Sequence, residues 1–228
     1  MVDTWAAQRP SARAFRRRLV IMVKQPIAGR VKTRLGRDIG AVAATMFYRH
    51  TMGNVAGRLF RDTRWQTLLS VAPAAAIKSA QLPGGIRRVP QINCDLGARM
   101  QAIFGLPGRG PIVIIGTDIP EVRPSHISAA FSALGSNEMV FGPATDGGFW
   151  LVGMRRTPRI IKAFRSVRWS SPDTLQDCFA GLAANQIGTV RMLRDVDDMC
   201  DLKLVKSTTG RRILPLRSEL PDKIDLND

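Results

Sequence analysis

Residues 19–36 read LVIMVKQPIAGRVKTRLG, an apolar run that leads directly into a loop rich in positive charge. The run LVIMV at 19–23 is continuous and is bounded by charged residues, which is typical of a strand buried on both faces of a parallel sheet. Four cations follow it within the loop: Lys24, Arg30, Lys32 and Arg34. Cations at the end of a buried strand indicate either a solvated basic loop or a site for an anionic ligand, because lysine and arginine both bind phosphate.

Apolar runs and stretches of helical periodicity alternate along the rest of the chain. Strands are predicted at 65–71, 86–91, 111–118, 138–144, 148–154 and 189–193, and helices at 41–60, 96–104, 124–134 and 170–186. In the last helix, Ser171 is the expected N-cap and Pro172 the first helical residue. The alternation predicts an α/β fold with a mostly parallel sheet covered by helices on both faces.

The length of 228 residues suits one ordinary domain that buries its core without disulfides. We expect a flexible basic arm at 1–18, a single domain at 19–205 and a peripheral tail at 206–228. No apolar run approaches the ~20 residues of a membrane-spanning helix, and the run at 19–23 is too short for a signal peptide. Three cysteines without CxxC spacing offer no zinc site and fit a reducing compartment, so we expect a cytoplasmic protein.

The formal net charge of +16 favours an anionic partner: nucleic acid, an acidic membrane surface or a phosphorylated small molecule. Nucleic acid is not favoured, because one Tyr and four Trp do not interleave with the basic residues as stacking platforms would. A solvated basic surface without any polyanion partner is the alternative.

Carboxylates follow two of the predicted strands. Asp118 ends the strand PIVIIGTD at 111–118, where a carboxylate is costly unless it meets water, a cation or a metal. A hard divalent ion that bridges this carboxylate to a diphosphate is one solution, and helix capping is another. The loop after 189–193 carries four more carboxylates, one of which could join Asp118 on a metal while the others cap or flank a helix: Asp195, Asp197, Asp198 and Asp201.

A third polar loop, GPATDGGFW, places Asp146 before Gly147 and Gly148. The glycines suit either a close approach to a ligand or a plain hairpin turn. The cationic loop lacks the Walker and GxGxxG patterns, and no Ser-His-Asp arrangement can be assembled. Because ligands of open α/β sheets bind beyond the carboxyl ends of the strands, the loops together predict a site for a nucleotide diphosphate and a metal.

Six segments occur in an order that is similar to a known bacterial family: VKQPIAGRVKTRL, QINCDLGARM, GTDIP, GPATDGGFWLVG, WSSPDTL and RDVDDMCDL. They resemble the radical-SAM/selenodomain-associated, or arsenosugar-biosynthesis, glycosyltransferases over about residues 19–205. The resemblance implies the nucleotide-diphospho-sugar transferase (GT-A) fold, a three-layer Rossmann-like α/β/α sandwich. Asp198 stands where the family usually has Thr in its last motif, and Asp also caps helices well.

The resemblance also implies roles for single residues. It places the phosphates of the nucleotide against Lys24, Gly29, Lys32 and Arg34. It assigns Mg²⁺ or Mn²⁺ to Asp118 and Asp197. Asp146, Gly147 and Gly148 would line the acceptor side, where Asp146 could orient or deprotonate the acceptor. Four further residues fall where related enzymes contact the base or sugar: Gln91, Leu96, Gly97 and Arg99.

These residues predict an enzyme, a metal-dependent transferase with Asp118 and Asp146 in its catalytic centre. The first hypothesis is glycosyl transfer from a nucleotide-activated sugar to a small acceptor. The second is a nucleotidyltransferase that joins an NTP to a phosphorylated small molecule and releases pyrophosphate, similar to the phospholactate guanylyltransferases. A non-enzymatic anion or nucleic-acid binder and an inactive nucleotide-binding member of the family are the remaining alternatives.

Overall fold

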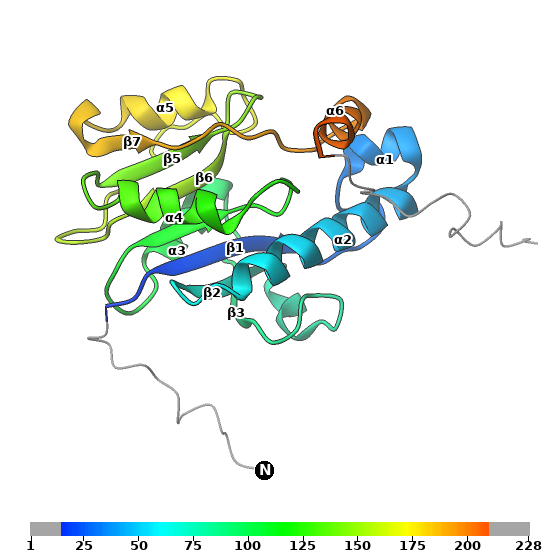
Figure 1. Cartoon of the computed structure of the whole chain (residues 1–228), viewed down its shortest axis with the longest axis horizontal. Helices are drawn as coiled ribbons and strands as arrows, with labels where there is room; N and C mark the ends of the chain where they lie inside the picture. The colour runs from blue at the N-terminus through cyan, green and yellow to red at the C-terminus, as the bar shows by residue number, and fades with distance from the viewer. Residues whose placement is uncertain (1–14, 210–228) are drawn as a thin grey trace, which may run out of the picture.

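The computed structural model of the chain describes residues 15–209 and contains a seven-stranded sheet of order β3-β2-β1-β4-β6-β5-β7 (Figure 1). Neighbouring strands pair in parallel except where β6 meets β4 and β5. Only β6 therefore runs against the other strands, and the predicted mostly parallel sheet is confirmed. The strands are β1 (Arg18–Lys24), β2 (Gln66–Ala72), β3 (Arg87–Pro90), β4 (Ile112–Ile115), β5 (Met139–Pro143), β6 (Phe149–Met154) and β7 (Ile187–Thr189).

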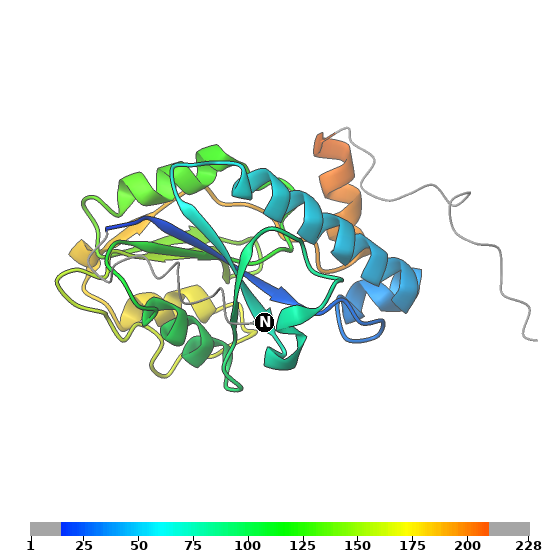
Figure 2. The ribbon, with the colours of Figure 1, turned by 90° about the horizontal axis from the view of Figure 1, so that it is seen from below.

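Helices cover both faces of the sheet, with α2 and α4 on one face and α3 and α5 on the other (Figure 2). The predicted three-layer α/β/α sandwich is thereby confirmed. None of the helices in residues 15–209 has the length and apolar character to cross a bilayer. The helices are α1 (Thr33–Ile39), α2 (Ala41–Phe60), α3 (Leu96–Phe104), α4 (Pro124–Ala133), α5 (Thr174–Ala180) and α6 (Met199–Thr209), with 3₁₀ turns η2 (Ala74–Lys78) and η3 (Ala184–Gln186).

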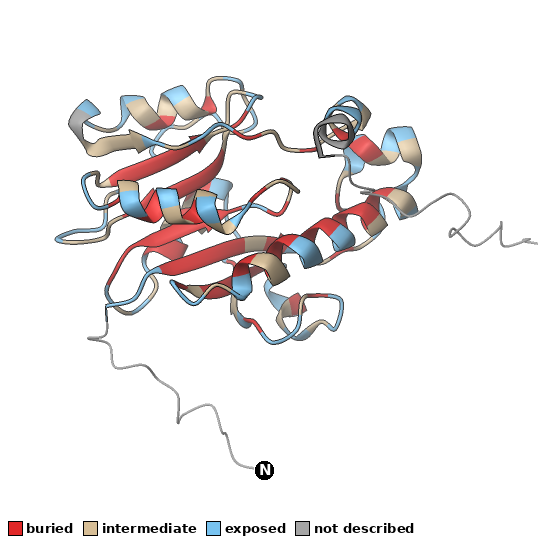
Figure 3. Ribbon diagram, viewed as in Figure 1, coloured by how far each residue is buried: buried red, intermediate tan, exposed pale blue. Residues whose placement is uncertain are grey.

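The central strands are buried on both faces, as Figure 3 shows for β1 and its neighbours. Successive side chains of a strand point to opposite faces. Leu19 and Ile21 therefore enter the core beneath α2 and α4, whereas Val20 enters the core beneath α3 and α5. Each fully buried aliphatic side chain stabilises the fold by about 1.5–3 kcal/mol. This two-sided burial explains why LVIMV is apolar at every position.

Several predicted elements differ from the structure. Helix α1 was not predicted, β4 ends at Ile115 rather than at Asp118, and α5 ends at Ala180 rather than at residue 186. The strand predicted at 189–193 corresponds to β7, which lies earlier, at Ile187–Thr189. Its regular pairing with β5 is interrupted after Thr189, because Pro143 of β5 has no N–H to donate, and contact resumes as an isolated bridge between Ala144 and Leu193. The helix predicted from Pro172 begins at Thr174 instead. Ser171 shapes a turn before it, since its Oγ accepts from the Asp173 N–H at 3.2 Å and its carbonyl from the Thr174 N–H at 3.1 Å.

The boundaries at the chain ends also differ. Arg18, predicted to belong to the flexible arm, is the first residue of β1, and its side chain is buried. Residues 1–14 of the predicted arm and 210–228 of the predicted tail lie outside the described residues. The tail was predicted from residue 206, whereas α6 extends to Thr209.

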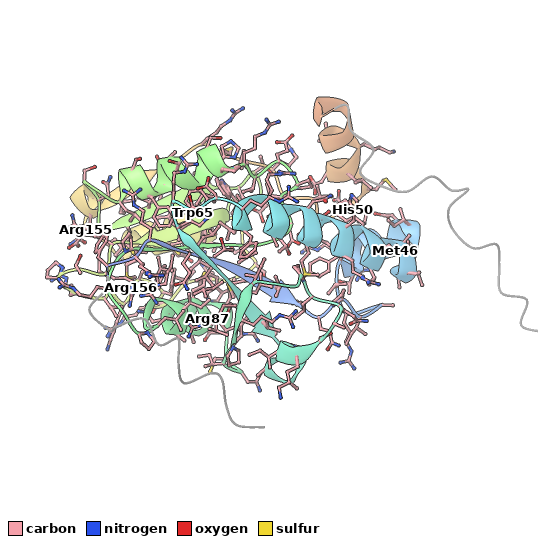
Figure 4. The ribbon with its side chains drawn as sticks, turned by 60° about the horizontal axis from the view of Figure 1, so that its bottom comes forward. Met46, His50, Trp65, Arg87, Arg155 and Arg156 are labelled. Carbon is pink, nitrogen blue, oxygen red and sulfur yellow. The ribbon has the colours of Figure 1, made fainter. Side chains whose placement is uncertain are left out.

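Two arginines hold the loop 106–110 at the far end of the sheet. Arg156 donates to the carbonyls of Leu106, Gly108 and Gly110, and Arg18 donates to the Pro107 carbonyl. Burial, with the charge of Arg18 as a smaller cause, lowers the pKa of Arg156 to about 10. Figure 4 shows Arg156 at the opposite end of the molecule from His50 on α2. These cations stabilise the loop by donating to its backbone carbonyls.

Candidate functional site

A cavity of about 560 Å³ opens at the sheet edge where β1 and β4 end. Its walls are the cationic loop after β1, the segment 116–118 after β4, the first turns of α3 and the aromatic side chains of Phe149 and Trp150. Helices α1 and α6 lie together at this end of the molecule (Figure 1). The cavity therefore occupies the edge at which the parallel strands deliver their following loops, as expected for this class of sheet.

Lys32 is the central cation of the cavity. It precedes α1 in a left-handed backbone conformation (φ 48°), and its side chain is only 5% exposed. Its Nζ lies 3.1 Å from Asp118 Oδ1 and 2.7 Å from Asp197 Oδ1. Burial disfavours the charged ammonium, but the charges and hydrogen bonds of the two carboxylates outweigh burial and raise the pKa of Lys32. The ammonium thus joins two acidic loops that are far apart in the sequence.

One backbone hydrogen bond joins the two acidic loops, and a side-chain bond holds the second loop against the start of α6. The Val196 N–H donates to the Asp118 carbonyl at 3.0 Å, and the Asp197 N–H donates to Asp201 Oδ2 at 3.1 Å. Asp198 Oδ1 accepts from the N–H groups of Cys200 and Asp201 and so caps α6. Asp198, which replaces the Thr usual in the resembled family, therefore still caps this helix. Of the four carboxylates at 195–201, Asp197 is the one in contact with Lys32.

Asp118 and Asp197 suit Mg²⁺ or Mn²⁺ as protein ligands. Both already hold one cation, the Lys32 ammonium, and about two fifths of each side chain is exposed (42% and 41%). Hard divalent ions prefer one or two carboxylates together with phosphate oxygens and water. Within residues 15–209, no group of three His, Cys, Asp or Glu side chains could hold a metal. A metal at this site would accordingly need other oxygen ligands in addition to the two carboxylates.

Other cations lie around the mouth of the cavity. Arg34 Nη1 lies 3.8 Å from Asp197 Oδ2, and its side chain is mostly exposed. Lys24, Arg30 and Arg99 line both this cavity and a second one of about 510 Å³ beside it. The two hollows therefore share a positively charged border that an extended anionic ligand could follow.

Gln91 lies at the same border. It is buried, donates from Nε2 to the Ser70 carbonyl at 2.7 Å and lines both cavities. Gly97 lies on α3 and faces the side chains of Phe164 and Trp169: a Cβ at this position would lie 2.6 Å from Trp169 Cζ2. The close contact with Trp169 and Phe164 leaves no space for a side chain at residue 97, so packing within the fold is enough to explain the glycine.

The DGG loop between β5 and β6 forms a tight turn. Asp146 Oδ1 accepts from the Gly148 N–H at 2.9 Å, and the Gly147 carbonyl accepts from the Leu175 N–H at 3.1 Å. Asp195 lies close enough to Asp146 for the two carboxylates to interact electrostatically. Burial, followed by the charges of Asp146 and Asp197, raises the pKa of Asp195 to about 6. A partly buried acidic group thus accompanies Asp146 beside the cavity.

Several predicted site residues come together, while others do not line the cavity. Of the residues lining it in the described part of the chain, seven were predicted as polar site residues: Lys24, Lys32, Arg34, Gln91, Arg99, Asp118 and Asp197. Leu96 also lines it. The predicted residues Gly29, Gly97, Asp146, Gly147 and Gly148 lie outside that lining. The cationic loop and the two acidic loops therefore form one site, whereas the DGG loop is a neighbour of it.

Tyr48 is a site residue that the sequence did not reveal. Its hydroxyl accepts from the Lys24 N–H at 2.8 Å and donates to the Lys24 carbonyl at 3.2 Å, and its side chain also hydrogen-bonds Thr117. Burial raises the pKa of Tyr48. The residue ties α2 to the ends of β1 and β4, and a tyrosine within an ordinary helical pattern carries no sequence signal of that role.

Solved structures share this fold. A provisionally assigned nucleotide-diphospho-sugar transferase from Desulfovibrio desulfuricans G20 is 27% identical, with a TM-score of 0.77 over 86% of this chain and 88% of that chain. A 4-diphosphocytidyl-2C-methyl-D-erythritol synthase from Anaerococcus prevotii DSM 20548 is 10% identical, with a TM-score of 0.54 over 86% and 99% of the chains. The glucosyl-3-phosphoglycerate synthase of Mycobacterium tuberculosis, in complex with Mn²⁺ and UDP, is 13% identical, with a TM-score of 0.51 over 93% and 88%.

The likeness confirms the predicted nucleotide-diphospho-sugar transferase fold. No curated protein matches the chain. Residues 55–171, which include β2 to β6 and the Asp118 and Asp146 loops, match the bacterial family described as "Uncharacterized protein conserved in bacteria (DUF2064)". This match covers more than half of the chain, which therefore belongs to that family.

Proposed function

We propose that the chain is a metal-dependent transferase that uses a nucleotide-activated donor, and that it transfers a glycosyl group from an NDP-sugar to a small acceptor. One observation carries the proposal: a buried lysine joins two partly exposed carboxylates in a cation-bordered cavity at the carboxyl edge of the sheet. A diphosphate and a divalent cation have complementary charges to these groups. The predicted association with radical-SAM or arsenosugar proteins stays a prediction.

Each group has a role in the proposed reaction. Asp118 and Asp197 would hold Mg²⁺ or Mn²⁺, which supplies Lewis-acid stabilisation of the departing phosphate. Lys32 and Arg34 would offset the negative charge that develops on that phosphate, and preorganised electrostatics of this kind is usually the largest catalytic contribution. Asp146 would orient or deprotonate the acceptor at the neighbouring loop. Gln91 and Arg99 would contact the base or sugar of the donor.

The structural neighbours support the proposal. The synthase from Mycobacterium tuberculosis is in complex with Mn²⁺ and UDP, and a CMP-2-keto-3-deoxy-manno-octonic acid synthetase of the same fold is in complex with CTP. Both neighbours are under 25% identical to this chain, so they support the proposal through the shared fold.

Nucleotidyl transfer from an NTP to a phosphorylated acceptor is the second candidate. The observation that favours it is the number of cations on the cavity wall, which exceeds the two carboxylates there: Lys24, Arg30, Lys32, Arg34 and Arg99. An NTP carries more negative charge than an NDP-sugar, and a cavity with this excess of positive charge would accommodate a triphosphate. The two candidates differ in the donor, so they can be separated by binding.

A thermal-shift panel of NDP-sugars and NTPs, each with and without Mn²⁺, tests the proposal. Ligands that bind only the folded chain raise its Tm. Glycosyl transfer predicts that an NDP-sugar gives the largest Mn²⁺-dependent rise, whereas nucleotidyl transfer predicts that an NTP does. No rise with any nucleotide would refute both candidates.

The variant Asp118→Asn tests the assigned metal ligand. It should abolish the Mn²⁺-dependent rise in Tm while the chain stays folded by circular dichroism. Asp62→Asn is the matched control, because Asp62 pairs with Arg64 on the surface away from the cavity. An unchanged Mn²⁺-dependent rise in Asp118→Asn would remove Asp118 from the site.

A further inference from the structure

The Lys32 ammonium occupies the position that a metal shared by Asp118 and Asp197 would need. One oxygen of each carboxylate, Asp118 Oδ1 and Asp197 Oδ1, contacts the same Nζ at 3.1 and 2.7 Å. Two cations so close together repel each other strongly in a site where the lysine side chain is 5% exposed. A divalent ion and the ammonium therefore cannot share these two oxygens.

The charges of the site lead to the same conclusion. The two carboxylates are balanced by the two cations nearest to them, Lys32 in direct contact and Arg34 at 3.8 Å from Asp197, so these four groups have a formal sum of zero. Three more cations line the cavity and make it positive as a whole: Lys24, Arg30 and Arg99. A divalent cation alone would leave the partly buried site with excess positive charge, which is unfavourable. The diphosphate of an NDP-sugar carries about two negative charges, and it would offset the charge that the metal adds.

The backbone around Lys32 allows its side chain to move alone. Val31 before it and Leu35 in α1 are buried and anchor the segment. The lysine side chain has four rotatable carbon–carbon bonds and lines the cavity, so its ammonium can reorient without a shift of α1. The fixed elements are thus the loop and the carboxylates, and the movable element is one ammonium group.

We propose that Lys32 competes with the metal for Asp118 and Asp197, and that its ammonium transfers from these carboxylates to the donor's phosphates when metal and donor bind together. This inference rests on the proposed function for the identity of the donor, but the competition itself concerns only Lys32, the two carboxylates and a divalent cation. The exchange makes metal and donor bind as one unit: the metal alone must displace an ammonium, and the donor supplies the new partner for it.

The experiment measures the binding of Mn²⁺ alone, by electron paramagnetic resonance of the free ion, to the full chain and its variants. Lys32→Gln and Lys32→Met remove the competing charge, and each should bind Mn²⁺ about tenfold more tightly than the original chain. Lys32→Arg keeps the charge and should show no gain. Arg37→Gln removes an exposed charge of α1 that is not among the ion-pair partners of Asp118 and Asp197 in the described residues, and screening should keep its Mn²⁺ affinity within about twofold.

Circular dichroism of each variant establishes that it is folded, and two neutral variants keep the test usable if one of them does not fold. An unchanged or weaker Mn²⁺ affinity in the folded neutral variants would overturn the competition. An equal gain in Arg37→Gln would also overturn it, because the effect would then be one of general charge. UDP and CTP binding in the presence of Mn²⁺ should weaken in Lys32→Gln, and unchanged binding would overturn the transfer to phosphate.

The two hypotheses fail in different ways. Absence of nucleotide binding by the original chain, with a gain in Mn²⁺ affinity in Lys32→Gln, would refute the proposed function and support the competition. Mn²⁺-dependent nucleotide binding by the original chain, without that gain, would support the proposed function and refute the competition.

Discussion

Replacement of Gly147 by alanine should loosen the loop between β5 and β6. Gly147 has φ +85°, and a Cβ there would lie 2.6 Å from the carbonyl carbon of Pro172 and still closer to its oxygen. The obstacle is backbone, which cannot rotate away as a side-chain tip can. The loop must separate from the segment around Pro172, and the bond from the Leu175 N–H to the Gly147 carbonyl will weaken.

The expected cost has two parts. A residue with a Cβ in the left-handed region costs about 1–2 kcal/mol. Overpacking against a neighbour that resists displacement costs about 1–3 kcal/mol. Gly147→Ala should therefore lower the free energy of unfolding by about 2–5 kcal/mol. Because Asp146 precedes Gly147, the variant should also impair the proposed role of Asp146 toward the acceptor.

Two matched variants separate these parts. Gly29→Ala has the strained φ (+76°) without any atom within 4 Å of the new Cβ, so it should cost only about 1–2 kcal/mol. Gly53→Ala lies inside α2 with neither feature and should stabilise the chain by about 0.5–1 kcal/mol. Urea denaturation followed by tryptophan fluorescence measures all three. If Gly147→Ala costs no more than Gly29→Ala, the contact with Pro172 does not constrain the loop.

Three further predictions concern other parts of the molecule. Arg156→Met should lower the free energy of unfolding by about 2–4 kcal/mol, because it removes bonds to the carbonyls of 106–110, whereas the exposed Arg159→Met should change it by less than about 0.5 kcal/mol in the same urea titration. Cys178 is buried, and burial raises the pKa of its thiol from 9.0 to about 12, so iodoacetamide at pH 8 should label only the two exposed cysteines, as measured by mass spectrometry. As the pH rises from 9 to 12, the Cys178 thiol ionises in the unfolded chain before it does in the folded chain, so the free energy of unfolding should fall. The fall should be less steep in Cys178→Ala. Arg99→Met should weaken nucleotide binding by about tenfold in a calorimetric titration with little change in Tm, and unaltered affinity would argue against its contact with the donor.

Most of the fold could be predicted because its signals are local. The apolar run at 19–23 becomes the doubly buried β1, and the helix predicted at 41–60 coincides with α2. One error, at 189–193, has a determinant that is distant in the sequence. Thr189 ends β7 because of Pro143 on the neighbouring strand, and no pattern within 189–193 carries that information.

The candidate site was predictable to a similar degree and for similar reasons. Asp118 follows a buried strand, and this position identifies it as a candidate site residue. The loop after β1 is identified in the same way by its four cations within eleven residues. The role of Gly97 could not be inferred, because the Trp169 side chain that covers it comes from a distant segment. Asp195 and Asp197 look alike in the sequence, yet only Asp197 contacts Lys32, since burial and direction depend on how the chain crosses the sheet edge.

The large positive charge is partly explained by the loops of this fold. Arginines stabilise several loops by donating to backbone carbonyls: Arg18 to one, Arg156 to three and Arg88 to four, in the segment 77–83. A guanidinium group has five N–H donors and remains charged, so it can satisfy several carbonyls where a neutral side chain could not. Because these arginines donate to backbone carbonyls of the fold, their charge does not by itself indicate a surface for a polyanion. Among the described cations, we expect those that line the cavity to bind an anionic ligand: Lys24, Arg30, Lys32, Arg34 and Arg99.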